Sequence, residues 1–155
     1  MQYVFLSHSK DETKELGFFL SGLFERGDVV LLKGDLGAGK TTFTSGVGKG
    51  LGIKDDVISP TFNIMKCYFD GRIPMYHIDA YRLENQNIEL GLEEYIEGDG
   101  VCFIEWPDYI LPLLPDITLS IFLRNKGDDL REIMLVGEGK HFEDLISKVK
   151  EKFHD

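Results

Sequence analysis

The sequence feature that most constrains the fold is the segment Gly34-Asp35-Leu36-Gly37-Ala38-Gly39-Lys40-Thr41. It fits the pattern G-x-x-x-x-G-K-[ST] in full, and it lies between the short apolar run 29–32 and a segment of helical character at 40–51. Glycines at these positions let several backbone N–H groups turn toward one cavity, and the start of the helix adds a partial positive charge. The segment therefore predicts a phosphate-binding loop (P-loop, or Walker A motif) between a buried parallel strand and a helix.

The closing residues of this loop indicate what it binds. Lys40 is placed to reach the β- and γ-phosphates of a nucleotide, and the Thr41 hydroxyl can ligate Mg²⁺. We therefore expect the loop and the residue after it to hold a nucleoside triphosphate with Mg²⁺. The expected phosphate-binding residues are Gly34, Asp35, Leu36, Gly37, Ala38, Gly39, Lys40, Thr41 and Thr42.

A P-loop also needs an acidic residue near the metal, normally at the end of a neighbouring apolar strand. Two carboxylates qualify, because Glu105 follows the apolar run 101–104 and Asp79 follows 75–78. The run before Glu105 is the more continuous, so we assign Glu105 to Mg²⁺ and Asp79 to positioning the attacking water. A solvated carboxylate at a strand end is the alternative for either residue.

Thr61 lies in the segment Ser59-Pro60-Thr61-Phe62, about twenty residues beyond Lys40, where the proline favours an extended chain. A threonine on a loop at this distance can sense the γ-phosphate, as switch loops do, and we count it as a candidate catalytic residue. Simple turn chemistry is the alternative. His77 and His141 are expected to be structural, because a lone histidine is more often a packing residue than a ligand.

The segment Asn125-Lys126-Gly127-Asp128 matches the N-K-x-D pattern by which GTPases recognise guanine. A GTPase also needs D-x-x-G after a strand, and that tetrapeptide does not occur in the sequence. Asn, Gly and Asp between two strand-like runs are typical of a turn. We therefore interpret the segment as a turn and expect ATP as the nucleotide.

The remaining pattern indicates an α/β fold. Ser9 and Glu12 form a capping-box pair before an amphipathic helix at 11–24, and another helix closes the chain at 141–153. Asp70-Gly71 predicts a two-residue hairpin between strand-like runs. We expect one domain over residues 1–155 with a three-layer, P-loop NTPase-like fold, in which central parallel strands carry antiparallel strands at the sheet margins.

Composition argues against several classes of function. The net charge is −10, so the surface would repel a phosphate backbone and direct binding of RNA or DNA is a poor hypothesis. The N-terminal residues lack the basic flank of a signal peptide, and no apolar stretch approaches the roughly 20 residues that span a bilayer. Cys67 and Cys102 lie in apolar runs, which indicates buried thiols in a reducing compartment. We expect a cytoplasmic protein.

Several segments together resemble the TsaE (YjeE) family of bacterial P-loop ATPases. The P-loop alone is generic, whereas the Asp-Ala-Tyr-Arg and Glu-Trp-Pro elements are specific, and the resemblance covers nearly the whole chain. In order, the segments are Gly34-Asp35-Leu36-Gly37-Ala38-Gly39-Lys40-Thr41-Thr42-Phe43, Ser59-Pro60-Thr61-Phe62, Tyr76-His77-Ile78-Asp79-Ala80-Tyr81-Arg82-Leu83, Glu89-Leu90-Gly91-Leu92-Glu93-Glu94-Tyr95 and Ile104-Glu105-Trp106-Pro107.

The resemblance implies a role in forming threonylcarbamoyladenosine, a modified base beside the tRNA anticodon. Members of the family bind the proteins TsaD and TsaB, the pair that transfers the threonylcarbamoyl group, and reach tRNA only through that complex. They hydrolyse ATP slowly alone and faster with these partners, in a regulatory or resetting role. The resemblance thus implies a weak, partner-stimulated ATPase that is not itself the transferase.

The family pattern agrees with the metal, phosphate and catalytic roles given above and adds three residues. Trp106 corresponds to a residue of the site or of the TsaD interface, and an apolar lid on the sheet edge is the alternative. Thr13 and Arg131 correspond, by a looser match, to residues near the nucleotide base.

Two other functions fit a P-loop. One is a small-molecule kinase, which usually has a lid with several arginines that clamp the moving phosphate. The other is a scaffold that binds ATP without hydrolysing it. Slow hydrolysis is expected where no arginine finger lies in cis, so a partner or Arg82 would supply one. The arginines of the chain are scattered, at Arg26, Arg72, Arg82, Arg124 and Arg131.

Overall fold

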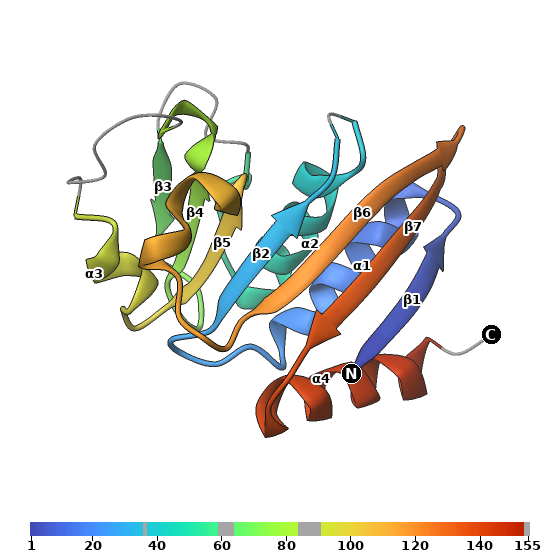
Figure 1. Cartoon of the computed structure of the whole chain (residues 1–155). Helices are drawn as coiled ribbons and strands as arrows, with labels where there is room; N and C mark the ends of the chain where they lie inside the picture. Colours follow the sequence, from blue (N-terminus) through green and yellow to red (C-terminus); the bar gives the residue numbers. More distant parts are fainter. Residues whose placement is uncertain (36, 59–63, 84–90, 154–155) are drawn as a thin grey trace.

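The computed structural model describes residues 1–35, 37–58, 64–83 and 91–153, and these form an α/β fold (Figure 1). Leu36 and Thr61, both predicted site residues, lie outside the described residues. The elements, with η for a 3-10 helix, are β1 (Gln2–Ser7), α1 (Lys10–Ser21), β2 (Val29–Lys33), α2 (Lys40–Leu51), β3 (Met65–Tyr68), β4 (Met75–Asp79), η1 (Ala80–Leu83), α3 (Glu93–Ile96), β5 (Val101–Glu105), η2 (Pro107–Leu113), β6 (Leu119–Gly127), β7 (Leu130–Gly137) and α4 (Lys140–Lys152).

The described strands form one sheet in the order β1-β7-β6-β2-β5-β4-β3. The central strands β6, β2, β5 and β4 pair in parallel, whereas β7 with β6, β1 with β7 and β3 with β4 pair antiparallel. This arrangement confirms the predicted class, with parallel strands at the centre and antiparallel strands at both margins. The carboxyl ends of β2, β4 and β5 meet at one edge of the sheet, where the P-loop begins.

Helices cover the two faces of the sheet unequally (Figure 1). α1, α2 and α4 pack on one face over the larger apolar core, and the short elements α3 and η2 cover the other face of β2, β5 and β4. Val30 and Leu32 belong to the first core, and Val29 and Leu31 to the second. Strand β2 is therefore buried on both faces, as its continuous apolar run predicts.

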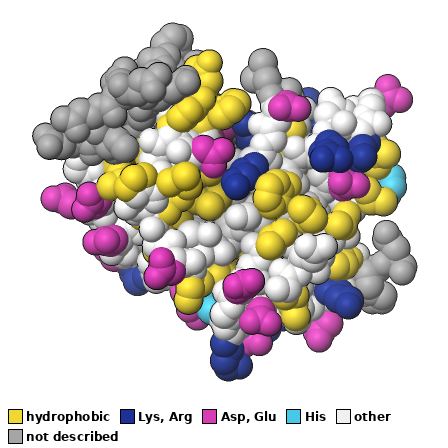
Figure 2. Space-filling model, viewed as in Figure 1, with side chains coloured by type: hydrophobic (Ala, Val, Ile, Leu, Met, Phe, Trp, Pro, Cys, Tyr) yellow, Lys and Arg dark blue, Asp and Glu magenta, His cyan; other side chains and the backbone are white. Residues whose placement is uncertain are grey.

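The face of β1, β7 and β6 that points away from α1 carries no helix among the described residues (Figure 1). Val4 and Leu6 remain exposed on β1, and apolar side chains lie among charged ones over the face of the molecule that Figure 2 shows. Within the described ranges, no helix is both long and apolar enough to cross a membrane.

The start of α1 follows the predicted capping pattern in part. The Ser9 hydroxyl accepts the N–H of Glu12 at 3.1 Å, as predicted. The Glu12 carboxylate, however, accepts the N–H of His8, one residue before the cap, where a capping box would use Ser9.

Glycines allow α1 and α2 to approach each other closely. A Cβ atom added at Gly46 in α2 would lie 2.3 Å from the carbonyl oxygen of Lys14 in α1, and one at Gly17 would lie 2.4 Å from that of Phe43. Any side chain at either position would therefore collide with backbone. The contact matters for the site because α2 begins at Lys40, directly after the P-loop.

The connection from β3 to β4 differs from the predicted two-residue hairpin. Tyr68 pairs with Met75, so six residues, 69–74, join the strands. This loop packs on the end of α2: the Arg72 N–H donates to Leu51 O at 2.6 Å, and Asp70 Oδ2 accepts the N–H of Lys54 at 3.0 Å. These tertiary hydrogen bonds outweigh the local preference of Asp-Gly for a tight turn.

The two cysteines are free thiols, as predicted. Cys102 is fully buried in β5, and Cys67 is half-buried in β3. Burial raises the pKa of both thiols above the ordinary value, which keeps them protonated and unreactive at neutral pH.

Candidate nucleotide-binding site

The P-loop joins β2 to α2 at the carboxyl edge of the sheet, and its glycines are structurally required. Gly37 and Gly39 have φ angles of 83° and 102°, in the left-handed region that favours glycine. A Cβ atom at Gly34 would lie 2.5 Å from the carbonyl oxygen of Leu123 in β6. Gly39 is the N-cap of α2, and no described side chain accepts a hydrogen bond there. The first amides of α2 are therefore available to an anion.

The ammonium of Lys40 lies at the centre of this loop. Its Nζ donates to Gly34 O at 2.7 Å, forms an ion pair with Glu105 Oε1 at 3.2 Å, and lies 5.6 Å from the centre of the Trp106 ring. Only 12% of the side chain is exposed. Phosphate oxygens are strong acceptors for such a cation and would compete with the carbonyl and the carboxylate for its donors.

Glu105 and Asp79 end two adjacent parallel strands, β5 and β4, and are opposite each other in the register. Glu105 is also the register partner of Leu32 in β2, the strand that leads into the P-loop. Glu105 is buried, whereas Asp79 is half-buried and its Oδ1 accepts the N–H of Tyr81 at 3.1 Å. Both carboxylates thus lie where the sequence places them; their roles toward Mg²⁺ and water stay predictions.

Two donors hold the carboxylate of Glu105, one on each oxygen. Lys40 Nζ is 3.2 Å from Oε1, and His77 Nε2 is 2.6 Å from Oε2. Burial raises the pKa of Glu105, but His77 and Lys40 lower it by more, so the pKa lies below its ordinary value. Glu105 is therefore ionised at neutral pH and able to accept hydrogen bonds or ligate a cation.

The contact between His77 and Glu105 was not predicted from the sequence. His77 is a fully buried core residue, as a structural role requires, but its ring also bonds the carboxylate of the site. The sequence signal that could have indicated this contact is the alternation of side chains along a strand. His77 lies two residues before Asp79 and therefore on the same face of β4. His141 is structural as expected: its Nε2 is 2.8 Å from Asp28 Oδ2.

A cleft of about 430 Å³ opens where these elements meet, a size typical of small-molecule sites. Of the predicted residues it brings together Thr13, Gly37, Gly39, Lys40, Thr41, Thr42, Asp79, Glu105 and Arg131, and Trp106 also lines it. It does not include Gly34, Asp35 or Ala38, which shape the loop behind it. Ser9, Lys10 and Asp129 line it without having been predicted.

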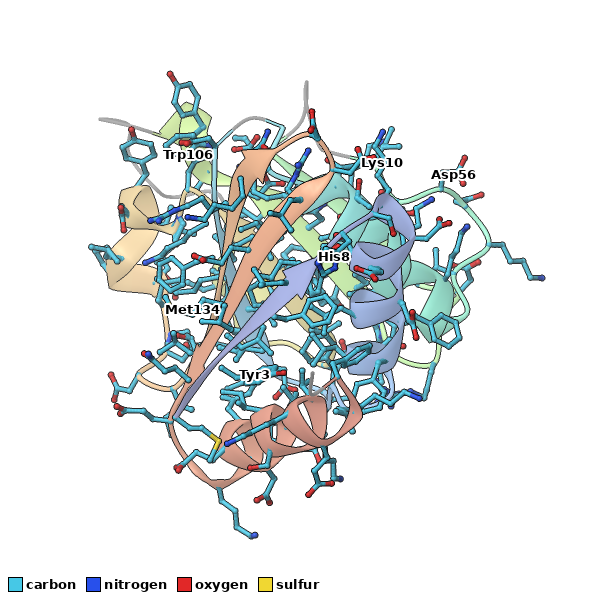
Figure 3. All side chains as sticks on the ribbon, turned by 90° about the vertical axis from the view of Figure 1, so that its right-hand side faces the viewer. Tyr3, His8, Lys10, Asp56, Trp106 and Met134 are labelled. Atoms are coloured by element: carbon cyan, nitrogen blue, oxygen red, sulfur yellow. The ribbon has the colours of Figure 1, made fainter. Side chains whose placement is uncertain are left out.

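The far rim of the cleft is formed by α1 and the β6–β7 hairpin. Figure 3 shows Lys10 and Trp106 at the same end of the molecule, on either side of the end of that hairpin. Thr13 is buried, and its hydroxyl lies 2.6 Å from that of Ser7. Sequence pattern alone could not find Ser9 and Lys10, because only the packing of α1 on α2 brings them to the loop.

Hydrogen bonds within the β6–β7 turn place Arg131 at this rim. Its Nη1 donates to Asn125 Oδ1 at 3.1 Å and to Asp128 O at 2.8 Å. Asn125 Oδ1 also accepts the N–H of Gly127 at 2.8 Å, and Asp128 has a φ of 47°. Asn125, Lys126 and Gly127 form the irregular end of β6, and the turn itself is Asp128-Asp129. The interpretation of the segment as turn material is therefore confirmed in part, with a shorter turn than the sequence predicts.

The residues present suit Mg²⁺ more than a metal with a full set of protein ligands. In the part of the chain that the structure describes, no group of three or more His, Cys, Asp or Glu side chains could hold a metal ion. A hydroxyl at Thr41 and a carboxylate at Glu105 line the same cleft. Mg²⁺ typically takes one or two protein oxygens and completes its shell with phosphate oxygens and water, so this donor set fits it.

Comparison with known proteins gives one family. The family described as "Threonylcarbamoyl adenosine biosynthesis protein TsaE" matches residues 7–133. The chain is 47% identical to the tRNA threonylcarbamoyladenosine biosynthesis protein TsaE of Bacillus subtilis, over 90% of this chain and 88% of that one. It is 40% identical to the protein of the same name from Nostoc sp., over 95% and 93% of the two chains.

A solved structure agrees with these sequence relatives. The crystal structure of Bacillus subtilis YdiB superposes with a TM-score of 0.85 at 41% sequence identity, and the match covers 98% of this chain and 96% of that one. With the fold, the P-loop and both strand-end carboxylates in place, these similarities over most of the sequence show that the chain belongs to the TsaE family.

Proposed function

We propose that this chain is an ATP-binding, slowly hydrolysing P-loop ATPase that acts in the formation of threonylcarbamoyladenosine in tRNA. The observation that carries the proposal is the single cleft that joins Lys40 and Thr41 of the P-loop to Asp79 and Glu105 at the ends of two neighbouring parallel strands. Nucleotide hydrolysis needs this set of groups. The chain also belongs to a family that is named for the biosynthesis of threonylcarbamoyladenosine.

Each residue has a distinct task in this proposal. The free amides at the start of α2 and the ammonium of Lys40 bind the phosphates, while the Thr41 hydroxyl and Glu105 hold Mg²⁺. Mg²⁺, when bound, neutralises charge that develops on the phosphate oxygens. Asp79, whose Oδ1 is fixed by the Tyr81 N–H, orients the water that attacks the γ-phosphate and gives ADP and phosphate.

The use of the arginines supports slow hydrolysis by the chain alone. Arg26 donates to Asp99 O, and Arg72 donates to the carbonyls of Ser21 and Phe24. Among the described side chains, Arg131 is the arginine that lines the cleft. An added arginine finger accelerates related P-loop enzymes by roughly 10³–10⁵, so a partner that supplies one, or that repositions Arg82, would stimulate turnover strongly.

The partners we propose are TsaD and TsaB, which bind beside the cleft. Trp106 and Tyr81 are 43% and 52% exposed there, with ring centres 5.1 Å apart, and the Trp106 ring stacks on Tyr109. Exposed aromatic clusters of this kind are enriched in protein interfaces. The net charge of −10 disfavours direct contact with tRNA, so tRNA is reached through the complex.

An ATPase assay of the purified chain, with and without TsaB and TsaD, tests the proposal. We expect slow phosphate release by the chain alone, a marked increase with both partners, and loss of turnover in Lys40→Ala and Asp79→Asn. Equal rates with and without the partners would refute the partner-stimulated role. Single-turnover release of phosphate distinguishes a slow ATPase from a scaffold, because a scaffold would release none.

A further inference from the structure

His77 is a fully buried histidine whose hydrogen bonding is directed at one group. Its Nε2 is 2.6 Å from Glu105 Oε2, and its Nδ1 has no hydrogen-bond partner among the described residues. Burial of a polar group costs free energy unless a hydrogen bond compensates it. An apolar side chain would fill this position at lower cost, so packing alone does not account for a histidine here.

The direction of this hydrogen bond follows from the charge on Glu105. An ionised carboxylate can only accept, so Nε2–H of His77 donates to Oε2. The other oxygen, Oε1, faces Lys40 Nζ at 3.2 Å and the cleft that both side chains line. The bond from His77 thus fixes which oxygen of Glu105 is presented to the cleft.

We propose that His77 is a positioning residue of the nucleotide site, which holds Oε2 of Glu105 so that Oε1 is directed at the Mg²⁺ that accompanies ATP. The inference rests on the proposed function, because it concerns the same carboxylate. His77 itself touches neither nucleotide nor metal and acts only through Glu105. Loss of a partner that orients a metal ligand typically costs about 10–100-fold in metal affinity.

Two amide substitutions at this position separate positioning from packing. In His77→Gln the terminal amide reaches the place of Nε2 and can still donate to Oε2. In His77→Asn the amide ends near Nδ1, one bond too short for that contact. Both variants are neutral and polar, so they differ mainly in whether Glu105 keeps its donor.

The readout is a Mg²⁺ titration at fixed ATP, followed by the fluorescence of Trp106, the single tryptophan, which lines the cleft. We expect His77→Asn to raise the half-saturating Mg²⁺ concentration about 10–100-fold, and His77→Gln to stay near the original chain. The affinity for ATP in EDTA, which does not involve Glu105 as a metal ligand, should be the same in all three. Thermal unfolding of each variant is measured in parallel.

Equal half-saturating Mg²⁺ in the original chain and both variants would overturn the inference. So would a loss of ATP affinity in EDTA as large as the loss with Mg²⁺, because that pattern belongs to a packing role. If His77→Asn fails to fold, His77→Met takes its place, since it matches the length of glutamine without a donor. A wild-type chain that binds ATP neither with Mg²⁺ nor in EDTA would instead refute the proposed nucleotide function, and this inference with it; ATP binding that is the same with and without Mg²⁺ would refute this inference alone.

Discussion

Replacement of Gly46 by alanine tests whether the close contact of α1 with α2 is required by the fold. The new Cβ atom would lie 2.3 Å from the carbonyl oxygen of Lys14 and 2.8 Å from its Cα. Neither atom can rotate away, because both belong to the backbone of α1. Relief to an ordinary contact of about 3.5 Å requires a separation of the two helices by about 1 Å.

The change in the free energy of unfolding caused by Gly46→Ala is the sum of two opposing terms. Alanine gains about 1 kcal/mol over glycine in a helix interior. Overpacking costs about 1–3 kcal/mol, and the upper end applies here because the collision is with backbone. The net expectation is a loss of about 2 kcal/mol, which lowers Tm by about 4–8 °C in a chain of this size.

Gly22→Ala is the matched control for this measurement. Gly22 follows α1 with a right-handed φ of −74°, and a Cβ atom there has its nearest neighbour, Phe19 O, at 3.7 Å. Thermal unfolding followed by circular dichroism should leave this variant near the original Tm. Gly46→Ala should also bind ATP more weakly, because α1 carries one rim of the cleft. A Gly46→Ala chain as stable as the control would refute the packing argument.

Four further substitutions probe the cleft itself. Lys40→Met removes a charge-assisted contact worth about 1.5–3 kcal/mol, so titration calorimetry should show ATP affinity falling at least tenfold; an unchanged affinity would contradict the assignment. Arg131→Met should weaken ATP binding equally with Mg²⁺ and in EDTA, because Arg131 is assigned to the nucleotide base. Thr41→Val should weaken ATP binding only when Mg²⁺ is present, because Thr41 is assigned to the metal. The reverse pattern would contradict both assignments. Glu105→Gln, unfolded by urea in EDTA, should be less stable than the original chain above pH 4.5, and the difference should disappear as the pH falls below 4.5: the folded-state pKa of Glu105 is lowered, so its contribution is lost on protonation. A difference that does not change with pH would show that ionised Glu105 is not stabilised by the fold.

The P-loop end of the candidate site could be predicted from sequence because its residues are close together in the chain. The P-loop, the strand before it and the helix after it are contiguous, and the apolar runs before Asp79 and Glu105 place both carboxylates at strand ends. The other rim depends on contacts between distant segments. Ser9 and Lys10 reach the cleft only because Gly17 and Gly46 let α1 pack closely on α2.

The same distinction accounts for the errors elsewhere in the chain. The Asp70-Gly71 pair favours a tight hairpin locally, but the loop is held by hydrogen bonds to Leu51 at the end of α2 and to Lys54 just after it, 21 and 16 residues earlier in the chain. His77 has no motif of its own, and its partner Glu105 lies on the neighbouring strand. Patterns within one segment cannot reveal such pairs, although strand alternation does predict which face each side chain takes.

Under the proposed function an acidic chain has to bind a polyanion, and the charges around the cleft show what that binding requires. Of the described side chains that line it, three are basic (Lys10, Lys40 and Arg131) and three are acidic (Asp79, Glu105 and Asp129), so the formal charges of this described lining cancel. The net charge of −10 repels phosphate at long range, and salt screens that repulsion beyond about 8–10 Å. Attraction must therefore come from directed donors at short range, namely the loop amides and Lys40, with Mg²⁺ balancing the carboxylates. A site of this kind depends on geometry as much as on charge, so we expect a change in the spacing of α1 and α2 to weaken ATP binding, as we expect of a change at Lys40.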